Sequence, residues 1–326
     1  MQRALRSCRP LLPPLSLYPR FRKPGLLSPE PPFKVSFTGI PVYTLARFRG
    51  LGLSPARLRK VGVAEVVRRN SKSFADGGDL QFPQIVVDAG NPRFRNRRRY
   101  VAATKKIAKA LASVDPDALA INIGGECSLI PGVLSGLGRR FTGKPGVVWL
   151  DAHGDFNTSQ TTPSGYIGGM CLALACGRES SFLTQIGSEK ALVSEEAVAH
   201  IGSRALDAAE GKAMMDSPMM IKKASALRRR GIEDVAAEVA RFASERADWI
   251  VMHLDLDFLD SALMPSVNFP TSGGMGMSDV RAIANGLKES GKLRALNVTA
   301  YDPTKDPTGR YGRMIVKILA EIVSAR

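Results

Sequence analysis

The residues best suited to chemistry form the triplet Asp151, His153 and Asp155, which directly follows an apolar run at 147–150. A short apolar run flanked by turn residues is typical of a buried strand. Side chains two positions apart in an extended chain point the same way, so these three donors can converge on one point beyond the strand. Two carboxylates and an imidazole at the carboxyl edge of a parallel sheet predict a metal site, with an ordinary polar loop as the alternative.

Two more polar clusters follow strand-like segments. Residues 124–127, Gly-Gly-Glu-Cys, come after the apolar run 118–123, and Asp255 and Asp257 come after 249–254. This much negative charge in one cleft is unfavourable unless cations compensate it. Carboxylate oxygens with one imidazole suit Mn²⁺ better than Zn²⁺, and the carboxylates are numerous enough to bridge two ions. Such a pair of ions lowers the pKa of a bridging water and aims the hydroxide at an electrophilic carbon.

The elements that must position these clusters alternate between strand and helix. Strand-like segments lie at 34–40, 84–87, 118–123, 147–150, 197–201, 219–221, 249–254 and 293–298. Helical segments begin at Ser54-Pro55 and at about 100, 128, 233, 278 and 314. This alternation predicts an α/β fold, with one domain at 33–326 and a central parallel sheet of about eight strands covered by helices on both faces.

The N-terminal residues 1–32 have a different composition. They hold eight prolines, and six Lys or Arg residues precede the first acid, Glu30. Proline breaks regular helices, so we expect a disordered, basic, Pro-rich extension. An organelle-targeting peptide and a start codon placed too early are the alternatives.

Composition narrows the class of protein. The net charge is +16, but much of the excess lies in residues 1–24 and 93–99, without an aromatic ladder or a nucleic-acid motif. We therefore expect solvated basic surface and no nucleic-acid partner. No apolar run is long enough to span a bilayer, so no membrane partner is expected. The four cysteines have no CxxC spacing, which fits a reducing compartment and a cytoplasmic protein.

Together the three clusters resemble the signatures of the arginase/agmatinase (ureohydrolase) family. Residues 151–158 match Asp-Ala-His-x-Asp-x-Asn-Thr, Asp255-x-Asp257 precedes Gly273-Gly274, and 124–127 stand in place of Gly-Gly-Asp-His. The match runs over roughly 35–306. It implies a single three-layer α/β/α domain, hydrolysis of a guanidinium or amidine with release of urea or its counterpart and an amine, and homotrimers or homohexamers.

The resemblance also implies a set of metal ligands. These are Cys127, Asp151, His153, Asp155, Asp255 and Asp257. Asp151 and Asp255 would bridge two Mn²⁺ ions. Asp155 would bind one ion and act as a catalytic residue that hydrogen-bonds the attacking hydroxide. Cys127 stands where the family has a histidine on the first ion, and the remaining two ligands would complete the second.

Five further positions match the residues that arginases use for the amino-acid end of the substrate. Asn157, Thr162 and Ser164 correspond to the loop that holds the α-carboxylate. Asp207 and Glu210 correspond to the acids that meet the α-amino group. The resemblance therefore favours a complete α-amino acid, arginine or a close derivative, as the small-molecule substrate.

Three departures from the family pattern leave alternatives open. Cys127 replaces an imidazole, and a soft thiolate favours Zn²⁺ or Fe²⁺ over Mn²⁺, so one ion could be weakly held or replaced. Gly168 stands where arginases have a histidine thought to shuttle protons, and Ala300 where the family has a glutamate that pairs with the guanidinium. The alternatives are a modified guanidine such as N-hydroxyarginine, another guanidino acid, or an impaired member that serves binding or assembly. His200 and His253 lie in apolar strands and are expected to be core residues.

Overall fold

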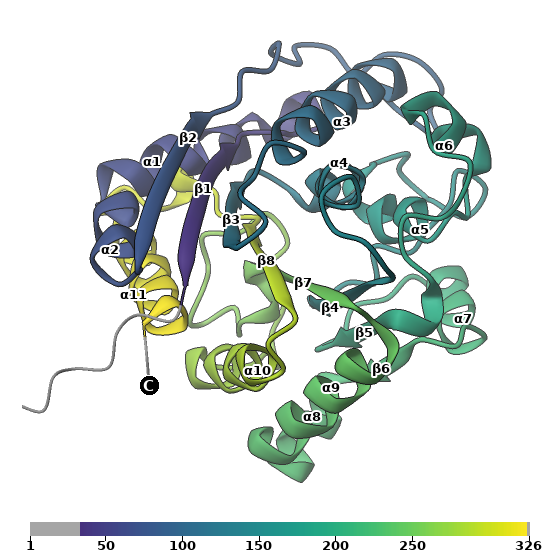
Figure 1. Ribbon diagram of the computed structural model, residues 1–326. Coiled ribbons are helices and arrows are strands. Elements are labelled where there is room, and N and C mark those ends of the chain that lie inside the picture. Colours follow the sequence, from purple (N-terminus) through teal and green to yellow (C-terminus); the bar gives the residue numbers. More distant parts are fainter. Residues whose placement is uncertain (1–32, 325–326) are drawn as a thin grey trace, which may run out of the picture. The chain divides into compact units, whose positions relative to one another are not determined.

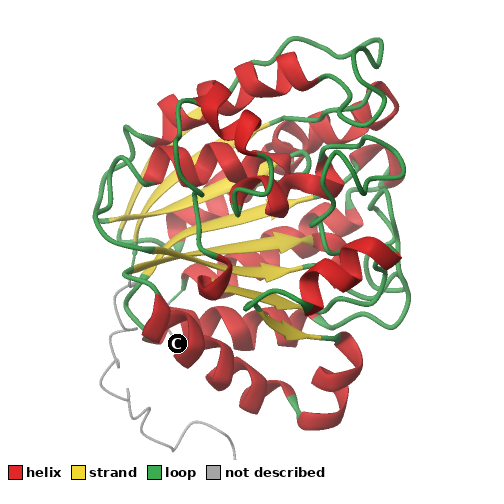
Figure 2. Ribbon diagram, turned by 90° about the vertical axis from the view of Figure 1, so that its right-hand side faces the viewer, coloured by secondary structure: helices red, strands yellow, loops and turns green. Residues whose placement is uncertain are grey.

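The computed structural model describes residues 33–324. The disordered extension predicted for 1–32 lies outside these residues. The strands are β1 Lys34–Ile40, β2 Ser73–Asp79, β3 Ala118–Gly124, β4 Pro145–Leu150, β5 Val198–Ile201, β6 Met220–Lys222, β7 Trp249–Asp255 and β8 Leu293–Thr299. They form one eight-stranded sheet in the order β2-β1-β3-β8-β7-β4-β5-β6. Every pairing is parallel, and the strand arrowheads in Figure 2 point one way.

The helices cover both faces of the sheet (Figure 1). They are α1 Ser54–Lys60, α2 Val63–Arg69, α3 Arg97–Leu111, α4 Ile130–Leu137, α5 Cys171–Ala175, α6 Ser180–Ile186, α7 Ala208–Met215, α8 Ala224–Arg230, α9 Ile232–Arg246, α10 Met277–Glu289 and α11 Arg310–Val323. One hydrophobic core joins the sheet to α1, α2 and α8 to α11, and a second joins it to α3, α4, α5 and α7. The predicted three-layer α/β/α architecture with an eight-stranded parallel sheet is confirmed.

Strand β7 contributes alternate side chains to the two hydrophobic cores. Met252 and Leu254 enter the first core, whereas Trp249 and Val251 enter the second. All seven residues of β7 are buried because helices cover both faces. The same alternation places His253 and Asp255 on the face of the second core.

The strand predicted at 84–87 is wrong. This segment is a loop in which Val86 and Val87 are 71% and 66% exposed. The second strand is instead β2, a polar segment with the sequence SFADGGD at the edge of the sheet. An edge strand has one partner and needs little apolar surface, so the hydrophobic pattern did not reveal it. Tertiary contacts fix it, since Arg59 of α1 pairs with Asp76 and Asp79 of β2 at 2.6 and 2.7 Å.

One row across the middle of the sheet is polar and aromatic. The strand registers align Asn122, Asn297, His253, Trp149 and His200 on five successive strands, from β3 to β5. All five are buried, and Asn122 donates a hydrogen bond to Asn297 at 2.8 Å. The sheet therefore carries a polar layer one pleat below the strand ends. Within residues 33–324, no helix combines the length and apolarity that crossing a bilayer requires.

Candidate active site

A cavity of about 400 Å³ lies where β3, β4, β7 and β8 end. It is lined by the eleven site residues predicted from the sequence: Cys127, Asp151, His153, Asp155, Asn157, Thr162, Ser164, Asp207, Glu210, Asp255 and Asp257. The parallel topology brings them together because neighbouring strands present their carboxyl ends at one edge.

Asp151 and Asp255 lie at the centre and follow the same local rule. Asp255 ends β7 and Asp151 directly follows the adjacent β4, and each accepts a hydrogen bond from the backbone N–H two residues on. The two distances are 2.7 Å, to the nitrogens of His153 and Asp257. This turn holds one carboxylate oxygen in place and leaves the other for a further partner. In Asp151 that second oxygen, Oδ2, accepts from the indole N–H of Trp149 at 3.0 Å.

His153 lies between two carboxylates. Its Nδ1 is 3.0 Å from Oδ2 of Asp257 and 3.6 Å from Oδ1 of Asp151. Burial by itself would lower the pKa of this imidazole, but the two carboxylates outweigh burial and raise it to about 12. In the absence of metal, His153 is therefore the cation that partly balances the cluster.

The carboxylates themselves resist ionisation. Burial, and next the charge of Asp257, raises the pKa of Asp255 to about 8, and burial with the charge of Asp151 raises that of Asp257 to about 6. Burial and the charges of Asp151 and Asp255 also raise the pKa of Asp155 well above its usual range. Asp155 adopts a φ of 49°, a left-handed conformation uncommon outside glycine. Backbone strain of this kind is often retained where a side chain must be held in one direction.

The donor set fits two divalent cations. Among the described residues, Asp151, His153 and Asp257 offer ligand atoms within 4.8 Å of one another, and a second such group consists of Cys127, Asp151 and His253. Both groups contain Asp151. One shared carboxylate between two ligand clusters is the arrangement that two bridged ions require, and their positive charge offsets the carboxylate repulsion.

Cys127 lies inside this cluster, at the start of the 3₁₀ turn Cys127–Leu129. Its thiol donates to Oδ2 of Asp255 at 2.8 Å, and Oγ1 of Thr299 is 3.4 Å from the sulfur. Burial, and then the charges of Asp255 and Asp155, raises the pKa of the thiol well above its usual range. Without metal, Cys127 is therefore a neutral thiol, and a cation would have to displace its proton to bind the sulfur.

The opposite wall of the cavity belongs to the loop after β4 and the start of α7. Nδ2 of Asn157 donates to Oδ2 of Asp207 at 2.9 Å. Glu210 is buried and braces this wall, because its carboxylate accepts from the backbone N–H groups of Phe156 and Asp207. Burial raises the pKa of Glu210 to about 7. The geometry gives Glu210 a bracing role and leaves Asp207 as the more exposed acid.

Thr162 and Ser164 shape the remaining part of the loop. The hydroxyl of Thr162 accepts from the backbone N–H of Gly165 at 3.0 Å, and that of Ser164 accepts from the N–H of Tyr166 at 3.2 Å. Both hydroxyl hydrogens are therefore free to donate to a ligand.

The model of the arginase family matches residues 33–324. The chain belongs to the arginase family. Arginase from Bacillus caldovelox is 30% identical over 291 residues, which cover 88% of this chain and 97% of that protein. Arginase from Brucella melitensis is 28% identical over 292 residues, covering 87% and 94%.

Solved structures agree with this assignment. The Bacillus caldovelox arginase structure has a TM-score of 0.84 at 29% identity and covers 90% of this chain and 99% of that chain. Proclavaminate amidinohydrolase from Streptomyces clavuligerus, at 18% identity and a TM-score of 0.68, shares the fold over 90% and 91% of the two chains. The protein is thus a ureohydrolase of the arginase family, an enzyme acting on C–N bonds of linear amidines.

Tyr166 is a cavity residue of this arginase-family enzyme that the sequence did not reveal. A Cβ built on Gly168 would come within 2.3 Å of the Tyr166 ring, so the phenol occupies the space of the missing side chain. The Tyr166 hydroxyl donates to Oε2 of the buried Glu126 at 2.8 Å. Burial and the charge of Glu126 raise the phenol pKa well above its usual range. The enzyme therefore places a neutral hydroxyl group beside Gly168, in space that a larger side chain at 168 would need.

Ala300 lines the cavity together with Glu126. It adopts a φ of 69°, and its N–H donates to the carbonyl of Gly125 at 2.8 Å. Residue 300 carries no carboxylate. The acid next to the Ala300–Gly125 hydrogen bond along the chain is the buried Glu126. The only sequence signal for Tyr166 was its place two residues before Gly168. Its direction depends on the turn at Gly165, which has a φ of 66°.

Proposed function

We propose that this enzyme hydrolyses the guanidinium group of an α-amino acid, arginine or a close derivative, to urea and an amine. One observation carries the proposal: two ligand clusters that share Asp151 lie in the same cavity as a polar wall formed by Asn157 and Asp207. The metal end suits attack on a planar carbon, and the polar wall suits the charged end of an amino acid.

The ligands that would hold the two ions are the six predicted from the sequence, with Asp151 and Asp255 shared between the ions. Oxygen donors with His153 favour Mn²⁺ at the position next to Asp257, whereas Cys127 brings a softer donor to the other. A pair of bound divalent cations supplies activated water at neutral pH.

Asp155 is proposed as the catalytic residue. It is buried beside Asp151 and Asp255, and its raised pKa suits a group that takes a proton and releases it again. Water adds to the guanidinium carbon and transfers a proton to a carboxylate oxygen of Asp155. The departing nitrogen takes this proton as the C–N bond to the substrate's side chain breaks, and loss of the remaining O–H proton to the amine leaves urea and the ammonium form of the amine.

The opposite wall would hold the amino-acid end of the substrate. We assign the α-carboxylate to Asn157, Thr162 and Ser164, and the α-amino group to Asp207, braced by Glu210. The structure of arginase from Entamoeba histolytica, 25% identical, is a complex with L-ornithine, the amino acid that remains when urea is removed from arginine. This relative supports a full amino acid over agmatine or guanidinobutyrate, each of which lacks one of the two groups.

The part of the cavity lining formed by Ala300, Tyr166 and Glu126 supports N-hydroxyarginine as a second candidate substrate. Ala300 offers no carboxylate, and the polar groups there are the Tyr166 hydroxyl and Glu126. A neutral or hydroxylated guanidine needs a charge-assisted partner less than arginine does. A guanidino acid of another length is the remaining option. We further propose homotrimers or homohexamers and a cytoplasmic location.

The test is urea release by the full chain, with arginine, N-hydroxyarginine, agmatine and guanidinobutyrate compared in the presence of Mn²⁺. Activity should disappear in Asp151→Ala and persist in Asp216→Ala, a matched change at an exposed aspartate. Full activity after exhaustive chelation would refute the metal mechanism. Less than one ion per chain and no turnover of any guanidine would favour a binding or assembly protein.

A further inference from the structure

His253 is a buried imidazole that the proposed reaction does not use. It is fully buried, as predicted for a core histidine, and among the described residues neither ring nitrogen has a hydrogen-bond partner. Its ring contacts that of Trp149, with centroids 4.1 Å apart. Buried polar atoms are almost always satisfied, so two unpartnered nitrogens on one ring need an explanation, which the surroundings of the ring must supply.

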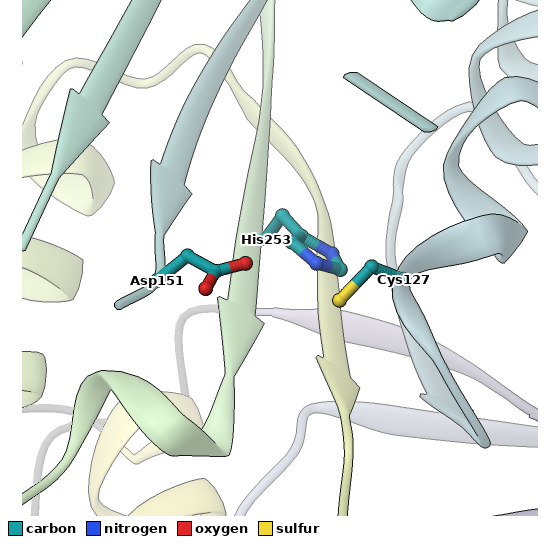
Figure 3. Close-up of side chains that lie close together, drawn as sticks. All are labelled: Cys127, Asp151 and His253. Carbon is teal, nitrogen blue, oxygen red and sulfur yellow. The ribbon is translucent and has the colours of Figure 1, made fainter. Parts of the chain in front are cut away.

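The surroundings of His253 supply that explanation. One ring nitrogen, the sulfur of Cys127 and a carboxylate oxygen of Asp151 all lie within 4.8 Å of one another. Figure 3 shows the imidazole between Asp151 and Cys127, at the junction of three chain segments. Ligand atoms on one tetrahedral Zn²⁺ ion lie about 3.5 Å apart, so small side-chain shifts would close this group around an ion.

The position of His253 in the sheet explains the direction from which its ring approaches the Cys127 and Asp151 side chains. It precedes Asp255 by two residues on the same face of β7, as Trp149 precedes Asp151 on β4. His253 does not line the cavity, whereas Cys127 and Asp151 do. The imidazole therefore reaches the ligand cluster from within the protein and not from the cavity.

We propose that His253 is a metal ligand and that Cys127, His253 and Asp151 hold one ion of the pair. This inference rests on the two-ion site of the proposed function and changes the donor set of one ion. A thiolate, an imidazole and a carboxylate together suit Zn²⁺ or Fe²⁺, so the two positions of the site would prefer different metals. The hydrogen bond from the Cys127 thiol to Asp255 marks the proton that the ion would replace.

His200 provides the matched control. It stands on the other side of Trp149 in the same row, is fully buried, and also has two unpartnered ring nitrogens. Yet no group of metal donors among the described residues includes it. A leucine at either position removes one buried imidazole from the same layer, and only one of the two changes removes a proposed ligand.

The experiment loads the metal-free full chain with one equivalent of Zn²⁺ and measures zinc-edge X-ray absorption. We expect one sulfur at about 2.3 Å and one imidazole nitrogen at about 2.0 Å. The imidazole contribution should persist in His153→Ala and His200→Leu and vanish in His253→Leu, with Zn²⁺ affinity at least about tenfold lower. An unchanged spectrum and affinity in His253→Leu overturn the inference.

A measurement on the unaltered protein covers the case in which His253→Leu fails to fold. The chain has three histidines, so ¹⁵N-histidine NMR resolves each ring. One equivalent of Zn²⁺ should shift a ring nitrogen of His253 and leave those of His200 in place; no shift at His253 refutes the proposal. Zinc bound by His253 without urea release would refute the proposed function alone. Urea release with an unshifted His253 would refute this inference alone.

Discussion

Removal of the divalent cations should make the stability of this enzyme fall between about pH 6.5 and pH 8. The groups responsible are Asp255, whose pKa is raised to about 8, and His153, whose pKa is raised to about 12. In the unfolded chain these groups titrate near pH 4 and 6.5. Across the window the folded protein therefore holds two protons that the unfolded chain has released, so rising pH favours unfolding.

The size of the effect follows from the width of the window. Each proton held only by the folded state changes the free energy of unfolding by about 1.4 kcal/mol per pH unit, so the two groups lose about 4 kcal/mol together. Asp155 and Glu210 have raised pKa values and act in the same direction. The buried histidines of the polar row, with pKa values of about 4 and 3, are neutral in both states above pH 6.5 and do not contribute. A loss of about 4 kcal/mol is a large part of a typical domain's total stability.

The assay is urea denaturation of the chelated protein, followed by the fluorescence of Trp149 and Trp249, which are both buried. Asp255→Asn should remove about half of the pH dependence and stabilise the chelated protein at pH 8, while Asp216→Asn should leave both unchanged. Added Mn²⁺ should stabilise the enzyme more at pH 8 than at pH 6.5. Stability that stays constant or rises over this window without metal would refute the charge reasoning.

Three further predictions concern function. Cys127→His should bind Mn²⁺ more tightly, by about tenfold in titration calorimetry; an unchanged affinity would mean that Cys127 is not a ligand. Asp207→Asn should raise KM for arginine by about tenfold or more through loss of a charged hydrogen bond, and leave guanidinobutyrate unaffected; equal effects on both would refute the α-amino assignment. Tyr166→Phe removes a neutral hydroxyl from the cavity lining and should lower kcat for urea release by about 10 to 100-fold with little change in KM; unchanged kcat would leave the phenol a packing role.

The sequence predicted those features that depend on local pattern. The buried strands are near-continuous apolar runs, so the ends of β4 and β7 could be located to within one residue, and parallel topology then placed Asp151 and Asp255 together. Strand β2 could not be located in this way, because a polar edge strand is held by Arg59 and by pairing with β1 rather than by burial.

Features that depend on strand register or on the direction of a loop could not be predicted from the amino-acid sequence. Tyr166 fills the space beside Gly168 only because the loop turns at Gly165. His253 looked like an ordinary core residue, since nothing in its own segment shows that it lies beside Trp149 and below Cys127. That neighbourhood arises from pairing between strands about 100 residues apart in the chain, and periodicity carries no information about such pairing.

Cys127 and His253 should therefore be energetically coupled, which a double-mutant cycle can measure. Cys127→His alone leaves His253 on the same ion, and two imidazoles form a softer donor set than Mn²⁺ prefers, which limits the gain in Mn²⁺ affinity. Adding His253→Leu removes one of the two imidazoles and leaves the other among carboxylates, a set that suits Mn²⁺. The gain in Mn²⁺ affinity in the double variant should exceed the sum of the single effects by about 1 kcal/mol or more, whereas Cys127→His with His200→Leu should be additive within about 0.5 kcal/mol. Additivity in both cycles would show that the imidazole of His253 does not share an ion with Cys127.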